Sequence, residues 1–260
     1  MFDTVLKIIG NYLLIQVSIV LFILPFYWLY RRKYLPDGEF KVNFNQHLEY
    51  FFSSKYANWL VFFWAMGEAL VWFIIPEFLL VLLVFMRIRR KRELLYYDIY
   101  GTAAGTLAAF IIPIPASLLD KIPYVQPSMV SQAEYWFSKH GILALAYQPF
   151  SGVPYKVFTH LAPNYHFFIG TFLVFAVIVR ISRYYIIYLL ASGIYPFLHK
   201  YVYRNYARLF VVATFIFSLL LLRIYTSWGH HQVYPASLSK PLTFLNIKSE
   251  RWLNGYESSY

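Results

Sequence analysis

Long apolar runs, separated by short polar or basic segments, dominate this chain. The first run, Ile8 to Tyr30, is interrupted only by Asn11, Gln16 and Ser18. About 20 apolar residues suffice to cross a bilayer as a helix, so this run predicts a spanning helix. Arg31 to Lys33 follow it at once, and positive charge beside a spanning helix indicates its cytoplasmic end.

The second apolar run, Asn58 to Met86, is too long for a simple crossing. As one helix it would measure ~43 Å, whereas the hydrocarbon core is ~30 Å thick. Pro76-Glu77 interrupts it, and the basic cluster Arg87 to Arg92 follows. A crossing would put this cluster opposite Arg31 to Lys33, against the charge rule. We therefore expect a re-entrant hairpin that turns near Pro76; the alternative is one long, kinked helix.

The third run, Tyr97 to Ile114, predicts another crossing and opens with Gly101 and Gly105. Glycines four residues apart let a second helix approach closely. The partner is either another helix of the same chain or a second copy of it, and we favour packing within the chain.

A second irregular region follows a polar excursion, Ala116 to His140, that we expect outside. Gly141 to Ala146 and Tyr155 to Leu161 are apolar limbs too short to cross, and Pro149 to Pro154 breaks the chain between them. The residues expected to form this break are Pro149, Gly152 and Pro154. This predicts a second hairpin that enters from the opposite side.

The last apolar segments predict two crossings. A long helix over His166 to Leu190 carries Arg180 and Arg183, and Phe210 to Trp228 crosses once more. Lys200, Arg204 and Arg208 between them mark a cytoplasmic loop. We divide the chain into an N-terminal helix and loop (1–53), a membrane domain (54–228) and a polar tail (229–260).

Composition supports this class. Hydrophobic residues make up 60% of the 260 residues and charged residues only 13%, against roughly 25% in soluble domains. The net charge of +11 lies mainly in clusters beside apolar runs, which favours a membrane orientation signal over a nucleic-acid surface. With no cysteine, the chain has no disulfide or thiolate chemistry. The expected fold is an all-α polytopic membrane protein.

The order of hairpin, crossing, opposed hairpin and crossing is typical of inverted-repeat transporters, whose sites lie where the two repeats meet. Four ionisable residues could either bind a ligand at such a site or only stabilise the fold around it: Glu68, Glu77, Lys156 and Arg180. A buried ion pair of Arg180 with Glu68 or Glu77 would satisfy both charges. The carboxylates could instead bind protons. Lys156 could meet a lipid phosphate or extend to the interface.

Several stretches together resemble the DedA family, also called the VTT or SNARE-associated Golgi protein domain, in its YqaA-like branch. They are two carboxylates nine residues apart across a proline turn (Glu68, Pro76 and Glu77), the glycine pair (Gly101 and Gly105), the loop Gln148 to Thr159 after the lead Trp136 to Gly141, and the arginine pair (Arg180 and Arg183). The similarity covers roughly Ser54 to Ile194.

The resemblance implies two opposed re-entrant hairpins and the movement of lipids, such as polyprenyl phosphates or phospholipids, across the membrane. Glu68, Glu77, Lys156, Arg180 and Arg183 are the residues expected to bind or move the lipid. The expected partners are membrane lipids with anionic headgroups, and the expected location is the bacterial plasma (inner) membrane. The sequence does not decide between a monomer and a dimer, and nucleic acid is not an expected partner.

We find no pattern for a catalytic nucleophile or a metal cluster, so we expect no enzyme, metal or cofactor. His160 and His166 flank a Pro-Asn break but form only a weak metal signal. The alternative to lipid transport is a non-transporting membrane scaffold or an envelope-homeostasis protein.

Overall fold

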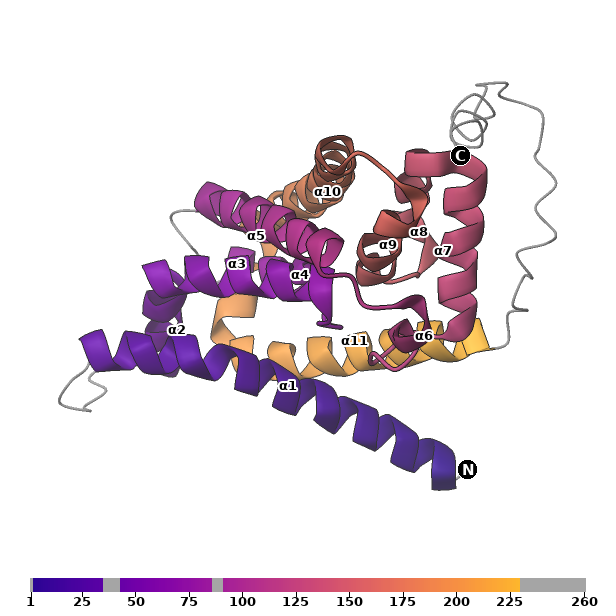
Figure 1. Cartoon of the computed structure of the whole chain (residues 1–260). Coiled ribbons are helices and arrows are strands. Elements are labelled where there is room, and N and C mark those ends of the chain that lie inside the picture. Colours follow the sequence, from indigo (N-terminus) through magenta and orange to yellow (C-terminus); the bar gives the residue numbers. More distant parts are fainter. Residues whose placement is uncertain (1, 35–42, 86–90, 230–260) are drawn as a thin grey trace, which may run out of the picture.

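The computed structural model describes residues 2–34, 43–85 and 91–229, and this part of the chain consists of helices and the turns between them, without strands (Figure 1). The basic residues Arg87 to Arg90 and the tail from 230 onward lie outside the described residues. The helices are α1 (Phe2–Tyr34), α2 (Phe44–Phe52), α3 (Lys55–Leu70), α4 (Pro76–Phe85), α5 (Lys91–Ile111), α6 (Ala116–Leu119), α7 (Pro127–His140), η1 (Gly141–Tyr147), α8 (Gln148–Ser151), α9 (Tyr155–Leu161), η2 (Ala162–Tyr165), α10 (Ile169–Arg204) and α11 (Tyr206–Gly229), where η denotes a 3-10 helix.

Three of these helices, α1, α10 and α11, are long and apolar enough to cross a membrane. Much of their apolar surface faces outward: Val17, Leu21, Val174 and Ile216 are each more than half exposed. Soluble monomers rarely expose large contiguous apolar surfaces. These helices therefore indicate an integral membrane protein, as the sequence predicted.

α1 and α11 pack side by side and antiparallel (Figure 1). Asn11 donates from Nδ2 to the backbone oxygen of Ser218 over 2.9 Å, and Gln16 donates to the hydroxyl of Thr214. Later positions of α1 therefore lie beside earlier positions of α11, as in an antiparallel pair. Apart from Ser18, the polar residues that interrupt the first apolar run are hydrogen-bonded between two helices.

The chain reverses direction between α3 and α4. The indole Nε1 of Trp64, near the end of α3, donates to the carbonyl of Ile74 over 2.9 Å, although the two residues are ten positions apart. At the far end of α4, Leu82 lines the same cavity as Phe51 and Phe52, which precede α3. A single kinked helix would carry Leu82 away from those residues. We refer to α3, α4 and the turn between them as the first hairpin.

The second irregular region also folds back on itself. Beyond Gly152, which has a positive φ of 75°, α9 returns beside α7. The ring of Phe158 on α9 stacks on that of Trp136 on α7 at a centroid distance of 6.0 Å. The expected first limb, Gly141 to Ala146, is a 3-10 helix instead of a regular α-helical turn. We refer to residues 127–161 as the second hairpin.

Two predicted helix boundaries are wrong. His166 adopts a left-handed conformation (φ 53°), so the long helix begins at Ile169 and not at His166. It also continues past Leu190 to Arg204, through Pro196. The residues beyond Leu190 are largely exposed, so the helix is not forced to end by packing against a neighbour. Its 36 residues correspond to ~54 Å, more than a bilayer core requires.

The predicted crossing Tyr97 to Ile114 corresponds to α5, which begins earlier and ends at Ile111, and α5 is not among the three helices apolar enough to cross by composition. Its glycine face packs within the chain, against α3. A Cβ at Gly101 would lie 2.1 Å from the backbone oxygen of Phe62, and one at Gly105 would lie 2.5 Å from that of Met66. The α3–α5 contact therefore requires glycine at both positions.

We predict that Gly101→Ala destabilises the protein by about 1–3 kcal/mol, because overpacking a close helix contact costs that much. Gly10→Ala on α1 is the matched control, since no atom lies within 4 Å of a Cβ there. Thermal unfolding in mild detergent measures both. Equal melting temperatures would show that α3 and α5 tolerate separation.

We also predict that both ends of the first hairpin lie on one side of the membrane. The chain has no cysteine, so single cysteines report position without background. With a membrane-impermeant maleimide, Ser53→Cys and Arg87→Cys should react from the same side, and Lys7→Cys from the other. Reaction of Arg87→Cys together with Lys7→Cys would reject the hairpin topology.

Candidate functional site

The breaks of the two hairpins face one cavity. Its volume is about 650 Å³, and Trp72, Phe73 and Ile75 of the first hairpin line it together with residues 148–154 of the second. α11 supplies another wall from Phe217 to Trp228. Of the residues singled out from the sequence, the following line it: Glu68, Pro149, Gly152, Pro154, Lys156 and Arg183.

Close backbone approach explains the glycine at the second break. Gly152 packs against α11, where a Cβ would meet the indole Nε1 of Trp228 at 3.1 Å. Its positive φ of 75° is also one that other residues rarely adopt. The neighbouring Phe150 is 91% exposed. Proline at 154 then starts α9, with no N–H to satisfy.

Of the two carboxylates predicted as partners of Arg180, the structure pairs it with Glu68, and the pair is buried. Nη2 of Arg180 lies 2.6 Å from Oε2 of Glu68. The guanidinium also lies over two aromatic rings, with its Cζ 4.6 Å from the ring centre of Tyr155 and 4.8 Å from that of Tyr184. Nη2 donates to the hydroxyl of Tyr184 as well. Glu68 and the two tyrosines therefore hold the guanidinium in place.

The second arginine pairs with the second carboxylate. Nε of Arg183 lies 2.8 Å from Oε1 of Glu77, which makes a salt bridge. The N–H of Arg183 does not point at this oxygen well enough to form a hydrogen bond. The side chain of Glu77 is 3% exposed and that of Arg183 is 20% exposed. Because Arg183 lines the cavity and its side chain is partly exposed, it is the one of the two arginines that a ligand can reach.

Lys156 borders the cavity, but its ammonium is engaged with the backbone. Nζ lies 3.1 Å from the carbonyl oxygen of Val71, 3.4 Å from that of Trp72 and 3.2 Å from that of Pro123. An ammonium has three N–H donors, and three carbonyls surround this one. A ligand phosphate would have to share or displace these contacts.

Two further residues of α9 bind the end of α3 in the same way. The hydroxyl of Thr159 donates to the carbonyl of Ala69 over 2.8 Å, and Nε2 of His160 lies 2.9 Å from that of Leu70. Nδ1 of His160 accepts from the backbone N–H of Ile114, so Nε2 carries the proton. Together with Lys156, these side chains satisfy the last carbonyls of α3, which a helix end leaves without partners.

Polar groups without partners remain at the cavity. Among the described residues, the indole Nε1 of Trp72 and the amide Oε1 of Gln148 are buried with no hydrogen-bond partner, and both residues line the cavity. Buried polar groups are nearly always satisfied, so such exceptions suggest a ligand or water. Neither residue was among those expected to bind the lipid, although Gln148 begins the loop that carries the family resemblance.

Sequence reasoning also missed Asp98. It lies on α5 and is buried, and both of its carboxylate oxygens lack hydrogen-bond partners within the part of the chain that the structure describes. Its charge interacts with those of Glu77, Arg180 and Glu68, which places it in the same cluster. A lone aspartate near the start of an apolar run is easily read as a residue at the membrane interface.

We compared the chain with protein-family models, curated proteins and solved structures, and none of them matches.

We predict opposite effects of neutralising two neighbouring carboxylates. Glu68→Gln leaves Arg180 buried without its counter-charge, and removing one partner of a buried pair costs ~3–5 kcal/mol. Asp98→Asn removes a buried carboxylate that has no partner, so it should leave stability unchanged or raise it. The melting temperatures of both variants in mild detergent provide the measurement, and an equal fall in the two would contradict the assigned pairing.

Proposed function

We propose that this protein is a DedA-like membrane protein that moves a phosphate-bearing lipid, a polyprenyl phosphate or a phospholipid, across the membrane. The observation that carries the proposal is the cavity at which both helix breaks meet. Broken helices at membrane depth are tolerated where they line a cavity, and transporter sites lie where such breaks face each other. An arginine and an unpartnered N–H donor at its wall favour an anionic headgroup.

The proposal includes a topology. The two hairpins enter from opposite sides of the membrane and form an inverted repeat around the cavity. The contact of Lys156, just after the second break, with Val71 and Trp72 at the first break supports tips that meet near the centre. The expected location is the bacterial plasma membrane.

The charged cluster comprises Glu68, Glu77, Asp98, Lys156, Arg180 and Arg183. We propose that Arg183 contacts the phosphate first, because its side chain is the partly exposed one in this cluster. Arg180 is fully enclosed by Glu68, Tyr155 and Tyr184, which fits a supporting role. Glu68, Glu77 and Asp98 are the candidates for proton binding if movement is coupled to protons. Phosphate arriving at Arg183 would compete with Glu77 for the same guanidinium.

A second candidate is a non-transporting scaffold. It is favoured by the fact that Lys156, Arg180 and Arg183 all have partners inside the protein. In a scaffold these contacts would only stabilise the fold.

Transport predicts that purified protein in liposomes speeds the flipping of a fluorescent phosphate-bearing lipid. In the double variant Glu77→Gln with Arg183→Gln, no charge is left unpaired, so the fold should persist while the rate falls toward that of protein-free liposomes. Arg208→Gln is the control, since Arg208 is exposed and does not line the cavity. A wild-type protein that moves no anionic lipid faster than empty liposomes would favour the scaffold.

A further inference from the structure

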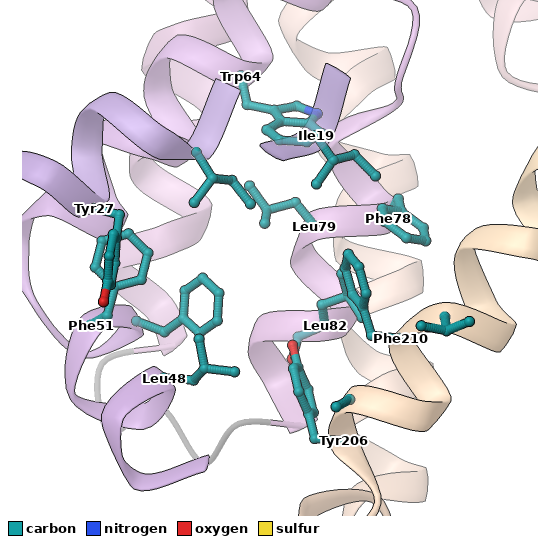
Figure 2. A pocket seen from close by; sticks show the side chains of 14 residues that line it. Ile19, Tyr27, Leu48, Phe51, Trp64, Phe78, Leu79, Leu82, Tyr206 and Phe210 are labelled. Atoms are coloured by element: carbon teal, nitrogen blue, oxygen red, sulfur yellow. The ribbon is translucent and has the colours of Figure 1, made fainter. Parts of the chain in front are cut away.

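A second, separate cavity of about 320 Å³ lies between α1, α2, α4 and α11. Figure 2 shows side chains of these helices and of α3 directed into it, with Trp64 toward one end and Tyr206 toward the other. Its volume falls at the lower end of the ~300–1,000 Å³ typical of small-ligand pockets. The ring of Phe78, which lines it, lies 5.1 Å from that of Phe217. Phe217 lines the cavity at the two hairpin breaks, the charged cavity. The two cavities are therefore neighbours divided by aromatic rings.

The lining of this second cavity has no free polar side-chain atom. Three of its 14 lining side chains contain a polar atom, and each of these atoms already makes a hydrogen bond. Tyr27 hydrogen-bonds to Nε2 of His47, Trp64 donates to Ile74, and Tyr206 donates to Leu82. A buried water needs two to four polar partners, so the cavity offers nothing to hold water in place. It suits an apolar occupant.

The cavity reaches the outer apolar surface of the molecule. Val211 of α11 lines it and is 51% exposed. On α1, Ile19 and Ile23 line it, whereas their neighbours Val20 and Leu24 face outward. Both helices are apolar enough to cross a membrane, so their outward faces would contact lipid chains. Such a chain can enter the cavity between α1 and α11 without leaving an apolar medium.

We propose that this cavity binds one hydrocarbon chain of a membrane lipid. It is a tail-binding site distinct from the charged cavity. The inference depends on the membrane location of α1 and α11 and not on transport. Straight acyl chains and isoprenoid chains share the chemistry that the site recognises.

Photolabelling tests this directly in the full chain reconstituted in lipid nanodiscs. The probe is a phosphatidylcholine with a diazirine near the end of one acyl chain. We expect label on Leu79 and Phe52, which are buried from the surrounding bilayer but line the cavity. Phe172 and Ala176, buried in the other core, should remain unlabelled. If Leu79 and Phe52 carry no more label than Phe172, the proposal is overturned.

A matched pair of variants tests the entrance. Val211→Trp adds an indole at the opening, whereas Val212→Trp adds one to an equally exposed position (51%) that does not line the cavity. Val211→Trp should reduce the label on Leu79 and Phe52 to the level of Phe172, and Val212→Trp should leave it unchanged. Equal labelling in two folded variants would reject entry between α1 and α11, and with it the proposal.

Competition by excess unlabelled phospholipid or excess polyprenyl phosphate, added separately, then distinguishes acyl from isoprenoid chains. The double variant at Glu77 and Arg183 should retain wild-type labelling. Failure of lipid flipping and failure of tail binding are therefore separate results.

Discussion

The break between α3 and α4 depends on side chains that come from α9, more than 80 residues later in the chain. A helix that ends inside a bilayer leaves carbonyl oxygens that no water can satisfy, and each costs several kcal/mol. Lys156, Thr159 and His160 bind the carbonyls of four successive residues, Ala69 to Trp72. Side chains of the second hairpin therefore stabilise the turn of the first. The two hairpins form one structural unit.

The charged cluster follows the same logic of mutual satisfaction. Each cation is held differently: Arg180 by a carboxylate and two rings, Arg183 by a carboxylate beside a cavity, and Lys156 by backbone carbonyls. If all six groups are ionised, the formal charges cancel. The acidic members are Glu68, Glu77 and Asp98, and the basic members are Lys156, Arg180 and Arg183. Among the described acidic members, Asp98 has neither a hydrogen bond nor a salt bridge, whereas Glu68 and Glu77 each pair with an arginine, so protonation of Asp98 disturbs its neighbours least.

Much of the fold could be predicted from the sequence because membrane helices are signalled by length and composition alone. The helices α1 and α11, the break at Pro76 and the break at Gly152 follow from apolar runs and from residues with restricted backbones. A buried pair of Arg180 with Glu68 or Glu77 was also predictable, since buried charges need counter-charges, but the choice of Glu68 was not. The predicted helix end at Leu190 was wrong, because α10 continues through Pro196 to Arg204.

Other features depend on which elements meet in space, and no local pattern contains that information. Thr159 and His160 resemble ordinary residues of a short helix until α3 ends beside them. Asp98 gains its position only when α5 packs against α10. The apolar cavity is formed by five helices whose sequences individually read as plain membrane segments.

The antiparallel contact of α1 and α11 has a consequence for the order of assembly. Ribosomes complete α1 long before α11, since Asn11 and its partner Ser218 are separated by 207 positions. During that interval Asn11 and Gln16 lie in an apolar helix without the groups that later bind them. Those two amides give α11, the last of the described helices, a specific docking place on α1. Closing α11 onto α1 is thus a late step that joins the beginning of the described chain to its end.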